Sequence, residues 1–341
     1  METMEVTLHL PPEFKKGHID KNYNNDIMSN RILPFIILAI ISCSCDKHSN
    51  VIPDYGRKIT INGIISTDSL LNVNIGKSAY IDDISGSAHN SLVDLDSVEV
   101  KVYLNGTVTD SLRHVAGYNY DVWKLFNPGN YRSAKLLPEP GHNFRITAKA
   151  KNLPDAEVTA TIPEVVQIIK IDTTTIILPP GTYISNSTGV KCDIAFTDPA
   201  LESNYYLLNI WEITSGKYFT SNNELEFTCA DPVVEETLSN GRKNQGIAFS
   251  DKLINGEKYK LSLIINREAI GIYTTENFQR ISFRLYSINE DFFDYIRLLN
   301  LCSKNFGNPL FEPVMLISNV KGGYGMLFGA AISSYNITVS N

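Results

Sequence analysis

The residues in this sequence that most clearly carry chemistry are two cysteines near the N-terminus. Cys43 follows Ile40-Ile41-Ser42, which puts an aliphatic side chain three residues before the thiol and a small residue directly before it. This pattern is typical of a bacterial lipobox, where a signal peptidase cuts before the cysteine and the thiol takes diacylglycerol. Cys45 is the alternative acceptor, although Ser42 then fits the aliphatic position poorly. The competing interpretation is an ordinary cleavage site in a secreted, unlipidated protein.

The segment before these cysteines has the three parts of an export signal. Met28 and Arg31 open it, the apolar run Ile32–Ile41 follows, and small residues precede Cys43. The run is too short to span a bilayer. We therefore predict a signal peptide over 28–42 and a lipidated tether over 43–56. Residues 1–27 are predicted to be an upstream extension, because they are too few to form a domain with its own core.

Residues suited to catalysis are sparse in the rest of the chain. Of the six histidines none follows His142, and those after the signal peptide are expected in loops or turns: His48, His89, His114 and His142. The remaining cysteines lack metal-site spacing and are expected to be buried thiols with at most one disulfide between them: Cys192, Cys229 and Cys302. Phosphate-binding glycine loops and nucleophile elbows are absent from the sequence. We predict no enzymatic activity, no cofactor and no metal.

Aromatic side chains gather in residues 118–131, a segment rich in Gly, Asn and Pro. Rings in such a loop suit contact with carbohydrate, peptide or protein, because they give contact area at low entropic cost. The residues predicted to contact a ligand or partner are Tyr118, Tyr120, Trp123 and Tyr131. The alternative is that Trp123 and two of the tyrosines fill a core. Trp211, in the strand-like segment Tyr205–Trp211, is expected to be a core residue.

Composition limits the classes of protein that this chain can belong to. It has 341 residues, of which 43% are hydrophobic and 20% charged, as in ordinary globular proteins. The length favours about two domains. The formal net charge of -7 argues against nucleic-acid binding, which calls for a basic surface.

Short alternating segments from residue 57 onward favour β-strands. The clearest is Val98–Leu104, and Asn105-Gly106 directly after it predicts a tight hairpin. One amphipathic helix is predicted over Glu290–Leu301, with Ser287 or Asn289 as its N-cap. We expect a mainly β protein: an Ig-like or prealbumin-like β-sandwich over 57–163, then a second β-rich domain over 164–341 with one or two short helices.

Several turn and corner motifs accompany these strands. They include Ile61-Asn62-Gly63, Pro138–His142, Asp231–Val234, Gly307–Val314 and Ser318–Gly325. With the lipobox, they make the sequence resemble, over about residues 31–341, the Bacteroidetes lipoprotein family known as domain of unknown function 4249. The extension over 1–27 departs from the pattern of that family.

The resemblance implies a lipoprotein of the outer membrane that serves a TonB-dependent nutrient transporter as a binding or accessory protein. Two other functions stay open: a surface hydrolase acting on glycan or peptide, and a structural adhesin or assembly subunit. The resemblance also implies candidate O-glycosylation where Asp precedes a hydroxyl residue, at Ser69, Ser97, Ser111 and Thr173. Ordinary turns at strand edges are the alternative explanation of those four matches.

Overall fold

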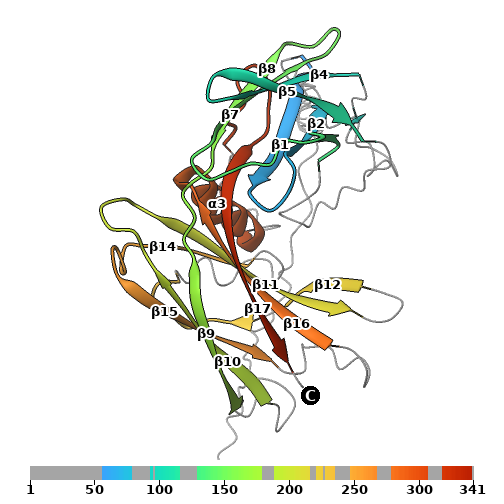
Figure 1. Ribbon diagram of the computed structural model, residues 1–341. Coiled ribbons are helices and arrows are strands. Elements are labelled where there is room, and N and C mark those ends of the chain that lie inside the picture. Colours follow the sequence, from blue (N-terminus) through green and yellow to red (C-terminus); the bar gives the residue numbers. More distant parts are fainter. Residues whose placement is uncertain are drawn as a thin grey trace, which may run out of the picture. The chain divides into compact units, whose positions relative to one another are not determined.

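The computed structural model describes residues 56–78, 93–94, 97–115, 129–178, 188–215, 220–225, 227–234, 246–266, 278–305 and 317–339. They belong to one compact unit, Gly56–Asn341. Strands dominate, and a single helix occurs within these ranges (Figure 1), so the prediction of a mainly β protein is confirmed. No helix in the described ranges has the length and apolar character needed to cross a membrane.

The strands of the first part of the chain build most of one hydrophobic core. They are β1 (Ile59–Ser66), β2 (Asn72–Lys77), β3 (Val93–Asp94), β4 (Glu99–Leu104), β5 (Thr107–His114), β6 (Tyr131–Arg132), β7 (Asn143–Lys149) and β8 (Ala156–Thr161). The predicted hairpin joins β4 to β5, where Asn105 and Gly106 have φ of 48° and 86°. Positive φ at both central positions is the geometry for which Asn-Gly is selected.

The second part of the chain supplies the remaining elements. They are β9 (Ile168–Ile177), β10 (Thr188–Thr197), β11 (Tyr205–Ser215), β12 (Thr220–Glu224), β13 (Phe227–Thr228), β14 (Ile247–Ser250), β15 (Lys258–Asn266), β16 (Phe278–Ile288), α3 (Glu290–Asn305) and β17 (Leu327–Val339). A four-stranded sheet runs β13-β15-β10-β9. The larger sheet runs β12-β11-β16-β17-β1-β2-β6-β5-β4-β7-β8, with β14 also beside β11 and β3 beside β2.

A second core lies between these two sheets. Cys192 and Phe196 of β10 face it from the smaller sheet, and Tyr206 and Phe283 face it from the larger one. The rings of Phe196 and Tyr206 are 5.5 Å apart. Alternation along each strand places these side chains inward, as expected for sheets packed face to face.

Strand β17 joins the two parts of the chain into one sheet. Its first residues pair in parallel with β1 (Gly63 with Leu327, Ser66 with Ala330), and its remainder pairs antiparallel with β16. Val320, Leu327 and Ala331 belong to the first core together with residues 59–162. Sequence reasoning did not identify β17. The first core is therefore completed by residues from the C-terminal end of the chain.

Helix α3 lies against the larger sheet, on the face opposite the second core. Asn289 is its N-cap, because the Asn289 side-chain oxygen accepts a hydrogen bond of 3.1 Å from the Phe292 amide. The Phe292 ring stacks on Phe328 of β17 at 4.5 Å. Tyr286 and Ile64 pack in the same cluster. This face of the sheet leads directly from the helix to a surface pocket.

Candidate ligand-binding pocket

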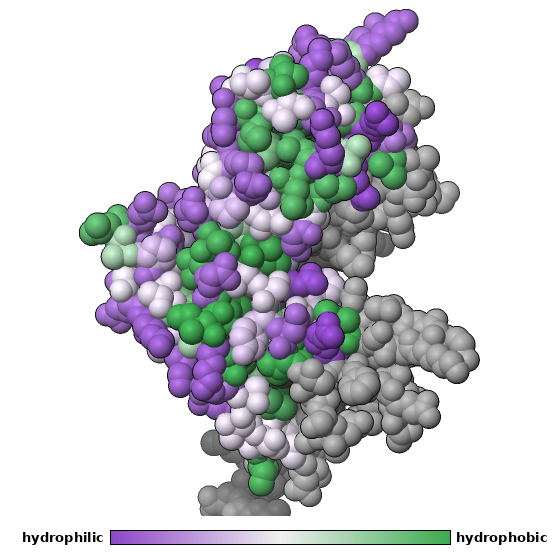
Figure 2. Space-filling model, viewed as in Figure 1, coloured by the Kyte–Doolittle hydropathy of each residue, from purple (hydrophilic) through white to green (hydrophobic). Residues whose placement is uncertain are grey.

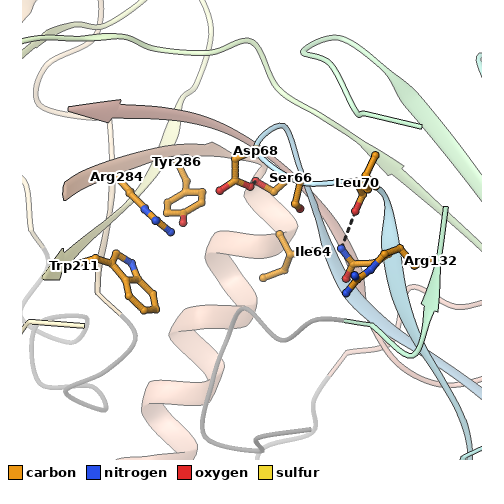
Figure 3. A pocket seen from close by; sticks show the side chains of 10 residues that line it. Ile64, Ser66, Asp68, Leu70, Arg132, Trp211, Arg284 and Tyr286 are labelled. Carbon is orange, nitrogen blue, oxygen red and sulfur yellow. Dashed lines mark hydrogen bonds between the residues drawn. The ribbon is translucent and has the colours of Figure 1, made fainter. Parts of the chain in front are cut away.

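A pocket of about 410 Å³ opens where the loop between β1 and β2 approaches β6, β11 and β16 (Figure 3). Pockets of this size accommodate small ligands. Residues from distant parts of the sequence line it: Ile64, Ser66, Asp68, Ser69, Leu70, Asn72, Arg132, Trp211, Arg284 and Tyr286. The lining combines two guanidinium groups, one carboxylate, an indole and several neutral polar groups.

The strand register explains how such distant residues share one pocket. On β16, Arg284 and Tyr286 are two residues apart and so point to the same face; they pair with Ser334 and Ile332 of β17. Ile64 and Ser66 are likewise two apart on β1, which pairs with the beginning of β17. Because β17 lies between β16 and β1, it brings both pairs of side chains to one region of the sheet.

Two arginines give the pocket its positive charge. The guanidinium of Arg284 lies 5.2 Å from the centre of the Trp211 ring, within the range of a cation–π contact. Arg132 reaches the pocket from β6 on the other side (Figure 3). No ion pair between either arginine and a described carboxylate is present. Both guanidinium groups can therefore bind an anion without first breaking an ion pair to one of those carboxylates.

The loop that forms the pocket rim is held by hydrogen bonds. Ser66 Oγ donates to Asp68 Oδ1 at 2.7 Å, and the Asn72 amide nitrogen donates to the Leu70 carbonyl at 2.8 Å. The oxygen of the Asn72 side chain accepts from the Gly129 amide at 2.7 Å. These contacts fix the loop before any ligand arrives, which lowers the entropic cost of binding.

Strand β6 is positioned by buried hydrogen bonds of Asn130, which directly precedes it, and of Tyr131, its first residue. The Asn130 side chain accepts from the Ile75 amide at 2.7 Å and donates to the Ile75 carbonyl at 2.8 Å. The Tyr131 hydroxyl accepts from the Val98 amide at 3.0 Å. Arg132, the next residue, is thereby held at the pocket wall.

Two of the aromatic residues singled out in the sequence, Tyr131 and Trp211, lie in surroundings other than those expected. Tyr131 is 1% exposed and belongs to the first core, so its predicted role in surface contact is wrong. Trp211 is only half-buried and lines the pocket, so its expected place in the core is also wrong. Tyr118, Tyr120 and Trp123 lie outside the described residues, and their predicted role remains a prediction.

The predicted modification sites fall into two groups. The lipid-acceptor candidates Cys43 and Cys45 lie outside the described residues. The four candidate O-glycosylation sites are exposed, as such a modification requires: Ser69, Ser97, Ser111 and Thr173. Ser69 also lines the pocket, so a glycan on it would occupy the rim.

Cysteines and histidines do not form a reactive centre within the part of the chain that the structure describes. Burial raises the pKa of the Cys192 thiol to about 12 and that of Cys229 to about 11. Both thiols therefore stay protonated at neutral pH and are poor nucleophiles. Cys302 is also a free thiol, and no cluster of potential metal ligands occurs among the described residues. The pocket lining contains neither Cys nor His.

Two carboxylates hold turns of the second part of the chain, the buried Asp198 and the half-buried Asp231. Asp231 accepts from the Ser262 amide at 3.1 Å and from the Tyr259 hydroxyl at 2.5 Å. Asp198 accepts from the Tyr206 hydroxyl and, at 2.9 Å, from the Gly256 amide. Burial raises the pKa of Asp198, while these hydrogen bonds oppose the rise. An Asp followed directly by Pro, as at both positions, is the turn signal that could have identified them.

The fold is mainly β, and it carries an open pocket whose lining includes two arginines. The sequence model of the family described as "Domain of unknown function (DUF4249)" matches residues 48–336. The chain belongs to this family, as its turn motifs indicated. No curated protein and no solved structure matches the chain.

Proposed function

We propose that the protein is a lipid-anchored binding or accessory subunit of the outer membrane that works beside a TonB-dependent nutrient transporter. The observation that carries the proposal is the pocket. It is open and is lined by preorganised polar and aromatic groups that can hold a ligand. Its single carboxylate, Asp68, lies on the exposed rim and accepts a hydrogen bond from Ser66 Oγ.

The export signal supports the location in this proposal. A lipid on Cys43 would fix the folded unit to a membrane through the short tether that ends at Gly56. Mixed polar and apolar residues over the visible face (Figure 2) offer a surface of the kind used in non-obligate protein contacts.

Co-purification tests the proposal directly. The tagged full chain, extracted from its native membranes in mild detergent, should bring down a TonB-dependent transporter that mass spectrometry identifies. The Cys43→Ala variant is the matched control, because it retains the folded unit but should leave the membrane. Recovery of no transporter with the wild-type chain, under conditions where known envelope complexes survive, would refute the partnership.

A further inference from the structure

The charge of the pocket is opposite to that of the whole chain. Its lining holds Arg132 and Arg284 against the single carboxylate of Asp68, whereas the chain as a whole has a net charge of -7. A positive site on an acidic protein attracts anions to one place. The planar guanidinium group matches the two oxygens of a carboxylate, with which it forms paired charge-assisted hydrogen bonds.

The pocket rim disfavours anions that carry no hydrogen-bond donor. Asp68 accepts one hydrogen bond from Ser66, and its carboxylate retains lone pairs that face solvent at the pocket edge. A sulfate dianion offers only acceptors and would be repelled there. Hydroxyl groups both donate and accept, so they can satisfy Asp68, Ser66 and Ser69 together. The rim therefore favours a ligand that carries hydroxyls as well as negative charge.

The aromatic wall adds a requirement for a flat, partly apolar face. The Trp211 ring lies beside Arg284 (Figure 3), is half-buried and lines the pocket. An indole contributes contact area to a ring laid against it without losing much conformational freedom. Sugar rings present such a face through their C–H groups, whereas small open-chain acids do not.

The separation of the two arginines sets the size of the ligand. Arg284 is on β16 and Arg132 on β6, with β17, β1 and β2 between them. Strands are spaced by about 4.8 Å, so the two backbones are about 19 Å apart along the sheet. Long side chains shorten this gap, and the two arginines approach the pocket from opposite sides (Figure 3). A ligand with carboxylates on two neighbouring rings can present one carboxylate to each guanidinium group.

We infer that the pocket binds a short acidic saccharide, an oligouronide whose carboxylates meet Arg284 and Arg132 while its hydroxyls meet the rim. This inference rests on the proposed binding function and names its ligand class. Ser66, Asp68 and Ser69 select for hydroxyls, and Trp211 supports one ring.

The test uses a matched pair of disaccharides that differ only at C6. Digalacturonate carries two carboxylates, and α-1,4-galactobiose carries two hydroxymethyl groups in their place. Isothermal titration calorimetry of the full chain measures the affinity for each disaccharide with every residue intact. We expect digalacturonate to bind saturably and at least about 10-fold more tightly than galactobiose, since a hydrogen bond to a charged group has about this effect.

Variants assign the effect to the pocket. Arg284→Gln and Arg132→Gln should each weaken digalacturonate binding about 10-fold or more and leave galactobiose unchanged. Arg280→Gln is the matched control, because Arg280 is an exposed residue of the same strand that does not line the pocket. It removes the same charge and should leave the affinity unchanged. The comparison of the two disaccharides uses the protein with both arginines intact. Its result therefore stands even if an arginine variant fails to fold.

Other outcomes overturn the inference in distinguishable ways. Equal affinity for both disaccharides would mean that the two arginines do not distinguish a carboxylate from a hydroxymethyl group. Competition by inorganic phosphate at concentrations as low as those of digalacturonate would mean a plain anion site. If neither sugar binds while the chain still co-purifies with a transporter, the ligand class is wrong and the proposed accessory function stands. If digalacturonate binds as expected and no transporter is recovered, the ligand class is supported and the proposed partnership is refuted.

Discussion

Replacing Asn130 by Ala should destabilise the folded protein more than an ordinary surface change. Asn130 is 2% exposed, and its side chain takes the place of a strand residue beside β2. One atom accepts from the Ile75 amide at 2.7 Å, and the other donates to the Ile75 carbonyl at 2.8 Å. Ile75 is fully buried. Truncation therefore leaves both of its backbone groups without these partners in a place that water cannot easily reach.

The magnitude follows from these two hydrogen bonds. Leaving one buried donor or acceptor unsatisfied costs about 1–3 kcal/mol. Two such groups, partly relieved by water or a small backbone shift, give an expected loss of about 3 kcal/mol in the free energy of unfolding. Arg132 lies two residues further on, so digalacturonate binding should weaken as well.

Urea unfolding of the full chain, followed by fluorescence, measures the loss. Asn336→Ala is the matched control, because Asn336 is an exposed residue of β17 and its truncation should change stability by less than about 0.5 kcal/mol. Asn130→Asp adds a second check. At pH 7 the new carboxylate would face the Ile75 carbonyl, whereas at pH 4 protonation would restore a donor and reduce the destabilisation. A midpoint for Asn130→Ala equal to that of the control would refute the reasoning.

Further substitutions test the anchor, the aromatic segment and the joint between the two parts. Cys43→Ala should abolish palmitate labelling and membrane attachment with an unchanged melting temperature; persistent labelling would identify Cys45 as the acceptor. Changing Tyr118 and Tyr120 together to Ser should weaken binding to the transporter or its cargo with little change in melting temperature, and the reverse result would place these rings in a core. Gly323→Ala would put a Cβ 2.4 Å from the Ile59 carbonyl oxygen, so calorimetry should show a loss of about 1–3 kcal/mol; an unchanged melting temperature would mean that the segment shifts freely.

Local signals in the sequence predicted the tight hairpin and the N-cap of the helix. The hairpin at Asn105-Gly106 and the Asn289 cap of α3 are both present. These features depend on neighbouring residues, so a single sequence contains them in full. Ser287, the alternative candidate, does not cap the helix. Its hydroxyl instead accepts a hydrogen bond of 3.0 Å from the Val166 amide.

Strand β17 could not be predicted from local sequence signals. Its sequence, LFGAAISSYNITV, has small and polar residues at many positions and no sustained alternation. Its strand character arises because β16 and β1 satisfy its backbone groups on both sides. Gly329 also allows a close approach, since a Cβ there would lie 2.2 Å from the Thr161 carbonyl oxygen. Pairing with distant segments overrides weak propensity here.

The sequence alone determined the β class, the helix cap, the tight hairpin and the export pattern, because each follows from residues within one short window. The tertiary structure alone decided that Tyr131 is buried and that Trp211 borders a pocket. Burial depends on which distant strands cover a side chain, and a strand has two faces that its own sequence does not rank. Arg132 and Arg284 are brought to one pocket by β17 and by the sheet order around it. That juxtaposition exists only after the two ends of the folded unit have paired.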